Sequence, residues 1–441
     1  MTGPFTMTKK GSTGMSPSLA GCIRNELRRG DLSRWIFYFS MLIVFALPFH
    51  IHATRYLIGG LLAVWLVDVV WNRKLFYLLN QRLVWVTILF YALHVVGLFV
   101  SSNTQKAWIE LEHKLTLFLL PLAFASVGMM ESGRRDRVLL AFVAGTLLVT
   151  LVSLAAYIVR LFDPSYLDYF LRFPLYNIYT DFSLFNHPTY YALFLELSIV
   201  VAFYLLRNTR IPVLFFFFIS IILLFSMLVF LASSRSGILS LLVIFMITIF
   251  MHCRRRNWKL FWIGTMVVVG FLATQNYRFG NYIDLAGKMA GGGELDTDEL
   301  VEKGAMRLVL WDVALDLSRD HLWFGRGTGD TQNALEQEYG RRDLKKHMDR
   351  NYNPHNQYLS TLMELGLTGL AVLSVLLLWP LILGIRHGDY LAVAFILLYM
   401  SHFMFESMLS RSPGILSFAF FYGLLILNRR ESISQQASNQ S

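Results

Sequence analysis

One histidine lies where a polar segment meets a long apolar run, a position suited to proton transfer at a membrane surface. The segment is Asn353-Pro354-His355-Asn356. Asn at the N-cap followed by Pro is typical of a helix start, so we expect a helix from Pro354 with His355 in its first turn. The positive end of the helix dipole disfavours imidazolium, which would keep His355 neutral as a general base, with Asn356 lining the same cavity. The alternative is that His355 merely lies at the membrane interface.

Arg235 is a candidate for binding an anion. It lies in Ser-Ser-Arg-Ser-Gly, directly after the charge-free run 211–231, and no Asp or Glu occurs between residues 225 and 245. The planar, five-donor guanidinium suits a phosphate group. The alternative is an arginine that extends its charge to the lipid headgroups.

Arg307 could likewise bind an anion or extend its charge to the lipid headgroups, and its neighbours favour anion binding. Residues 303–319 predict a helix on which Lys303, Arg307 and Trp311 share one face by i, i+4 spacing. Lys303 and Arg307 repel each other, and a shared anionic ligand would remove this cost. Trp311 would either pack at the membrane interface or stack on a sugar.

Further polar residues carry weaker signals. His187 opens another apolar run much as His355 does, so it could line the same cavity. Arg411 could line this cavity as well, or it could pair with Glu406 and stabilise the last hairpin. Glu196 and Glu364 lie inside apolar runs and therefore need a polar partner, either for structure or for catalysis.

Together these residues suit the cleavage of a bond between a sugar and a lipid diphosphate. Enzymes stabilise a departing diphosphate with a divalent metal or with Arg and Lys. The short loops on the side of His355 contain no D-x-D or D-x-E pair, so we expect arginine binding and no metal site. His355 would then take the proton from the attacking hydroxyl.

The elements that must position these residues are membrane helices. The chain has 441 residues, of which 55% are hydrophobic and 15% charged, a composition too apolar for a soluble protein. Its charge of +10 does not indicate nucleic-acid binding, because the positions of the cations follow the apolar runs. We expect an all-α polytopic membrane protein with about 12 transmembrane helices, from the charge-poor runs 35–49, 56–71, 83–100, 115–130, 138–158, 189–206, 211–232, 237–251, 260–274, 357–385, 390–405 and 414–427.

The distribution of cations predicts the orientation. With a cytoplasmic N-terminus, 21 Lys and Arg residues lie in inside segments and 7 in short outside loops, which favours cytoplasmic termini. We expect a cytoplasmic segment 1–34, transmembrane helices 1–9 within 35–274, a periplasmic helical loop 275–356 carrying catalytic residues, transmembrane helices 10–12 within 357–428, and a cytoplasmic tail 429–441.

At these positions the sequence resembles the bacterial O-antigen ligases. The shared features are twelve spans, a large loop between spans nine and ten, S-S-R-S-G after span seven, R-x-x-x-W in the loop, and P-H-N-x-Y-L entering span ten. The same superfamily contains O-antigen polymerases and pilin-type O-oligosaccharyltransferases.

The resemblance implies a GT-C-type glycosyltransferase of a Gram-negative inner membrane with its active site on the periplasmic side. It implies transfer of O-antigen polysaccharide from undecaprenyl diphosphate to a sugar hydroxyl of lipid A–core, with inversion and without metal or other cofactor. Arg235 and Arg307 would bind the diphosphate, and His355 would activate the acceptor. Its partners would be these two lipids and the surrounding membrane lipids, with no nucleic acid.

Two alternatives remain open at this stage. An O-antigen polymerase would use the same donor but another lipid-linked repeat as acceptor. A lipid-linked oligosaccharide flippase would use the cations along a transport path, although cations on one side and an 81-residue outer segment, 275–355, do not favour this.

Overall fold

A computed structural model describes residues 32–49, 51–72, 74, 81–127, 130–172, 181–231, 235–252, 256–274, 306–344 and 352–428. Within these ranges the regular secondary structure consists only of helices, as the apolar runs predicted. The expected cytoplasmic segments, apart from residues 32–34, and the first part of the long loop, 275–305, lie outside the described residues.

Each predicted apolar run coincides with a helix of the structure. The first half of the chain contains α2 (Ser33–Ala46), α3 (Ile51–Trp71), α5 (Arg82–Val100), α6 (Thr104–Ser126), α7 (Ser132–Leu161), α8 (Pro164–Arg172) and α10 (Pro188–Asn208). The second half contains α11 (Pro212–Leu231), α12 (Arg235–Ile247) with the π-helical turn Thr248–His252, α13 (Arg256–Thr274), α16 (Met306–Arg319), α17 (Thr331–Arg341), α18 (Gln357–Arg386), α19 (Tyr390–Phe403), the 3-10 turn Met408–Ser410, and α20 (Ser412–Tyr422) with the π-helical turn Gly423–Leu427.

Several of these helices begin at residues that satisfy their free backbone N–H groups. The side chains of Asn103, Asn356 and Asp389 each accept a hydrogen bond from an N–H in the first turn of α6, α18 and α19. Pro188 begins α10, where its fixed φ suits the first helical position. Side-chain caps therefore stabilise the starts of these helices.

Among the described helices, six are long and apolar enough to cross a membrane. They are α3, α5, α7, α10, α11 and α18. Shorter apolar helices lie at Ser33–Ala46, Ser236–Met251, Lys259–Val268, Tyr390–Phe403 and Ser412–Leu427. The fold is thus that of a polytopic membrane protein, with six candidate spans by length and composition rather than the twelve expected.

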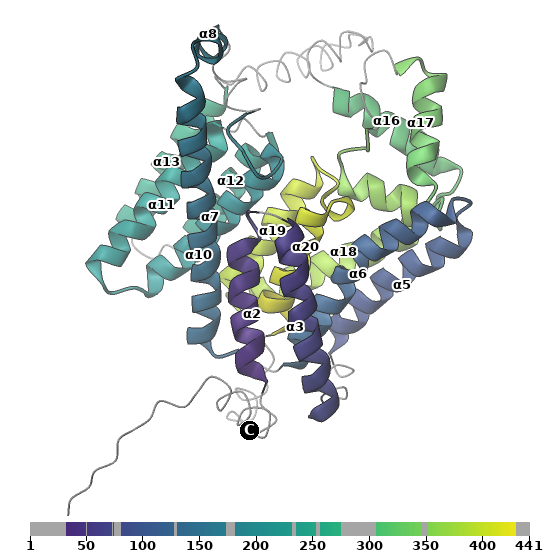
Figure 1. Cartoon of the computed structure of the whole chain (residues 1–441), viewed down its shortest axis with the longest axis horizontal. Helices are drawn as coiled ribbons and strands as arrows, with labels where there is room; N and C mark the ends of the chain where they lie inside the picture. The colour runs from purple at the N-terminus through teal and green to yellow at the C-terminus, as the bar shows by residue number, and fades with distance from the viewer. Residues whose placement is uncertain are drawn as a thin grey trace, which may run out of the picture.

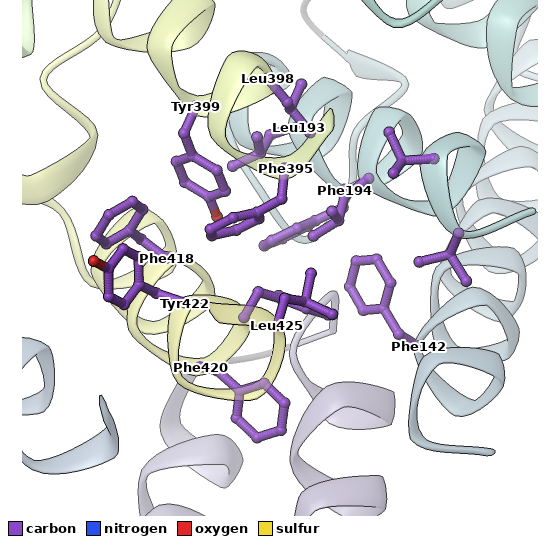
Figure 2. Close-up of a cluster of buried hydrophobic side chains, with 14 of the residues drawn as sticks. Phe142, Leu193, Phe194, Phe395, Leu398, Tyr399, Phe418, Phe420, Tyr422 and Leu425 are labelled. Atoms are coloured by element: carbon purple, nitrogen blue, oxygen red, sulfur yellow. The ribbon is translucent and has the colours of Figure 1, made fainter. Parts of the chain in front are cut away.

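The core lies where α7, α10, α19 and α20 meet in the middle of the molecule (Figure 1). Figure 2 shows Phe142, Phe194, Phe395 and Phe418 among the aromatic side chains there. The rings of Phe142 and Phe421 meet edge to face with centroids 4.9 Å apart. Edge-to-face aromatic packing of this kind holds α20 against α7, and Glu406 and Arg411 of the candidate site lie in the segment between α19 and α20.

The outer helices α16 and α17 pack on the beginning of α18 through a separate apolar cluster that includes Val313, Tyr339 and Met363 (Figure 1). α18 is not one continuous helix, as the single run 357–385 suggested, because Gly366 has φ +67° and interrupts it. The N–H groups of Leu367 and Thr368 instead donate to the carbonyls of residues 322 and 323. The break therefore holds the loop after α16 against α18.

Candidate functional site

The centre of the candidate site is a contact between His355 and Glu406. The Nδ1 atom of His355 lies 3.1 Å from both carboxylate oxygens of Glu406. A carboxylate only accepts hydrogen bonds, so Nδ1 is the ring nitrogen that donates to Glu406, and Nε2 is left as the nitrogen that could accept a proton. The pair therefore has the arrangement of a general base oriented by an acid.

Glu406 is almost fully buried, with 6% of its side chain exposed, whereas 25% of His355 is exposed. Burial alone would raise the pKa of Glu406, but the hydrogen bond from His355 and the positive charge of Arg307 lower it. The pKa of Glu406 consequently lies below its usual value, so Glu406 is ionised at neutral pH.

The helix start predicted at Asn353 and Pro354 is wrong. The N-cap of α18 is Asn356 and the helix begins at Gln357, so His355 precedes the helix. His355 has φ +47°, and its N–H donates to the Oδ1 of Asn353 at 2.9 Å. Residues other than glycine rarely adopt this left-handed conformation, which here turns the imidazole toward Glu406. A carboxylate, rather than the predicted first helical turn, thus orients His355.

A set of hydrogen bonds joins the start of α18 to the chain segment after α19. The backbone N–H of Asn356 donates to the Ser407 hydroxyl at 3.3 Å, and its side-chain amide donates to the Met404 carbonyl at 3.2 Å. The N–H of Leu409 donates to the side chain of Gln357 at 2.6 Å. These bonds fix the two segments that carry His355 and Glu406.

Arg307 and Trp311 approach the same place from α16. The Trp311 ring packs on Phe405 with centroids 6.4 Å apart, next to Glu406 in the chain. Arg307 lies one turn before Trp311, and its charge acts on both Glu406 and His187. The indole N–H of Trp311 is buried and has no hydrogen-bond partner within the described residues.

His187 and Tyr190 reach the site from the start of α10. His187 is the N-cap of this helix, and its side chain accepts a bond from the N–H of Thr189. Burial, together with the positive charges of Arg307 and Arg411, lowers the pKa of His187. The buried Tyr190 hydroxyl has no hydrogen-bond partner in the described part of the chain. A second donor without a partner thus lies beside Glu406, whose charge acts on it.

A cluster of buried polar side chains lies next to the site. The Glu196 carboxylate accepts from Ser240 at 2.7 Å and contacts the Nε2 of His402 at 2.5 Å, with His402 and Glu196 fully buried. The backbone N–H of Glu406 donates to the carbonyl of His402, so the cluster lies one turn from the Glu406 carboxylate. It ties α10, α12 and α19 together, and Arg235 begins α12 one turn before Ser240.

The structure brings His355, Arg307, Trp311, His187 and Arg411 into one region with Glu406. For Arg235 only the backbone is described, at the first residue of α12, and Lys303 lies outside the described residues. The expected pairing of Glu406 with Arg411 is not the contact found, since Glu406 bonds His355. No three His, Cys, Asp or Glu side chains in the described ranges are placed to hold a metal ion.

The sequence prediction missed the role of Glu406 and the presence of Tyr190. A carboxylate directly after an apolar run signals a buried acid that needs a partner, but it does not identify that partner. The expectation that Glu196 and Glu364 need polar partners is confirmed. Glu196 bonds His402 and Ser240, and Glu364 lies 3.0 Å from Lys114 and 3.5 Å from His94.

Comparison with known proteins yields one family. Residues 220–374 match the family model described as O-Antigen ligase. This range contains Arg235, Arg307, Trp311 and His355 and ends before Glu406. No curated protein matches the sequence.

Proposed function

We propose that this chain, whose residues 220–374 match the O-antigen ligase family model, is the ligase that completes lipopolysaccharide. Members of this family are glycosyltransferase-like enzymes of lipopolysaccharide biosynthesis. The specific reaction would transfer O-antigen polysaccharide from undecaprenyl diphosphate to a sugar hydroxyl of lipid A–core. The helices would lie in a bacterial inner membrane with both termini cytoplasmic and the site on the periplasmic side, as the distribution of cations favours.

The observation that carries this proposal is the contact between His355 and Glu406. With its proton on Nδ1, the His355 ring offers Nε2 to the acceptor hydroxyl. The hydroxyl oxygen attacks the anomeric carbon and loses its proton to Nε2. The bond from that carbon to the diphosphate breaks, and undecaprenyl diphosphate leaves with the electron pair. Attack opposite to the leaving group inverts the anomeric carbon.

The arginines would stabilise the departing diphosphate. Arg307 already lies close enough for its charge to act on Glu406 and His187, and Arg235 begins the helix that the Glu196 cluster ties to α19. Two guanidinium groups supply donors that match phosphate oxygens and need no metal ion.

Transfer measured with the purified protein in detergent tests the proposal. Donor and lipid A–core are supplied to the wild type, to His355→Ala, and to His321→Ala, an exposed histidine outside the site. We expect product from the wild type and the control, and none from His355→Ala although donor still binds. Near-normal transfer by His355→Ala would disprove the role of His355 as the general base. Transfer of the polysaccharide from one donor molecule to a second donor molecule, instead of to lipid A–core, would identify a polymerase.

A further inference from the structure

A cavity of about 390 Å³ lies beside the segment that carries His355. Lys106 and His113 of α6 form one wall, and Gln332 of α17 contributes to another. Asn353 and Arg411 also line it. The volume falls in the usual range for a small-ligand site.

The cavity carries positive charge that the protein does not neutralise. Arg55, Lys106 and Arg411 line it, and none of them forms an ion pair with an acid in the described residues. Positive side chains that lie together without forming ion pairs favour an anionic ligand, because their mutual repulsion is relieved when it binds.

The two acids of the lining are already engaged by a buried lysine. Lys114, with 2% of its side chain exposed, lies 3.0 Å from Glu364 and 3.4 Å from Glu110. The Nε2 of His94 also lies 3.5 Å from Glu364. Both carboxylates therefore already pair with Lys114, so they do not neutralise the three cations that line the cavity.

The neutral part of the lining is mostly polar. It includes hydroxyl and amide side chains, among them Gln332, Ser410 and Ser412, with few apolar residues such as Leu335. Hydroxyl and amide groups suit the hydroxyls of a sugar, whereas a polyprenyl chain requires an apolar surface. The composition thus favours a phosphorylated saccharide over the lipid tail of the donor.

The cavity lies beside the segment that positions His355. Asn353 lines it and accepts the backbone N–H of His355, and Arg411 lines it while its charge acts on His187. A sugar bound there would lie beside the segment that carries His355. We propose that this cavity binds the phosphorylated core sugars of the acceptor. The proposal rests on the ligase function given above.

The test replaces the two cations farthest in sequence from His355, in the double variant Arg55→Gln/Lys106→Gln. We expect its KM for lipid A–core to rise at least about tenfold, since each lost phosphate contact costs on the order of 1 kcal/mol. The donor KM stays unchanged. Arg319→Gln/Arg341→Gln removes two exposed cations elsewhere and serves as the matched control. A rise in the donor KM instead, or no change in either constant, would overturn the proposal.

Direct binding separates this proposal from the ligase function. The probe is the soluble phosphorylated core oligosaccharide released from lipid A–core by deacylation, measured on the intact protein without donor. Binding by the wild type and its loss in Arg55→Gln/Lys106→Gln support the cavity even where no transfer occurs, and absence of transfer then refutes only the ligase function. Equal binding of the dephosphorylated oligosaccharide, or of both oligosaccharides by the double variant, refutes the cavity.

Discussion

Replacement of Glu406 by Gln measures how much the negative charge of Glu406 stabilises the His355 imidazole during the reaction. The amide of Gln can still accept from Nδ1, so the ring keeps its tautomer while its negative partner is lost. Unit charges at the observed 3.1 Å interact by about 5 kcal/mol at an effective dielectric constant of about 20. With about half a unit of positive charge on the ring in the transition state, roughly 2.5 kcal/mol is lost, which is about a 70-fold lower rate.

The assay is transfer by purified protein at saturating donor and acceptor. We expect Glu406→Gln to lower kcat by this factor and to leave the donor KM unchanged. Glu131→Gln, at the start of α7 and 79% exposed, is the control and keeps wild-type kcat. A kcat for Glu406→Gln within about threefold of the wild type, with His355→Ala inactive, would refute a catalytic role for the carboxylate charge.

Three further predictions concern the arginine, the broken helix and the outer helices. Arg307→Lys should raise the donor KM about tenfold because a point charge lacks the bidentate fork, and Arg319→Lys on the same helix should not; equal values would exclude Arg307 from donor binding. Gly366→Ala should lower the Tm more than Gly388→Ala, since both glycines have positive φ but only the first has backbone of residue 323 within 2.4 Å of a Cβ; equal shifts would show that packing there is unimportant. Hydrogen bonds from neighbouring arginines lower the pKa of Glu338 from 4.5 to about 2, so its stabilisation of α17 is present above about pH 4.5 and is lost as the pH falls toward 2. Hydrogen exchange in α17 should increase over this range, and less so in Glu338→Gln; the same increase in both proteins would contradict the shift.

The helices were predictable from sequence because their signal is local. A charge-poor apolar run such as 211–231 can satisfy its backbone in a membrane only as a helix, and α11 covers it. The break at Gly366 was not predictable in this way. Glycine is common in membrane helices, and its positive φ depends on bonds from the next turn to residues 322 and 323.

The residues of the candidate site also differ in whether the local sequence could predict them. His355 and Arg307 could be identified because each is a polar residue at a position that its neighbours do not explain. The partner of His355 could not, since Glu406 lies 51 residues away and Arg411 is its nearer neighbour in the chain. The start of α18 was misplaced because Asn353 and Asn356 are both good N-caps, and the contacts of Asn356 with Met404 and Ser407 decide between them.

The distance between His355 and Glu406 along the chain also determines when the protein can act during its synthesis. A nascent chain that has been inserted as far as α18 already contains Arg235, Arg307 and the histidine, but its imidazole has no carboxylate partner. The pair forms only after α19 and the turn at Met408–Ser410 have folded against the start of α18. If the proposed function is right, the site is therefore complete only after the last helical hairpin has been inserted, and chains that stop before it would be inactive.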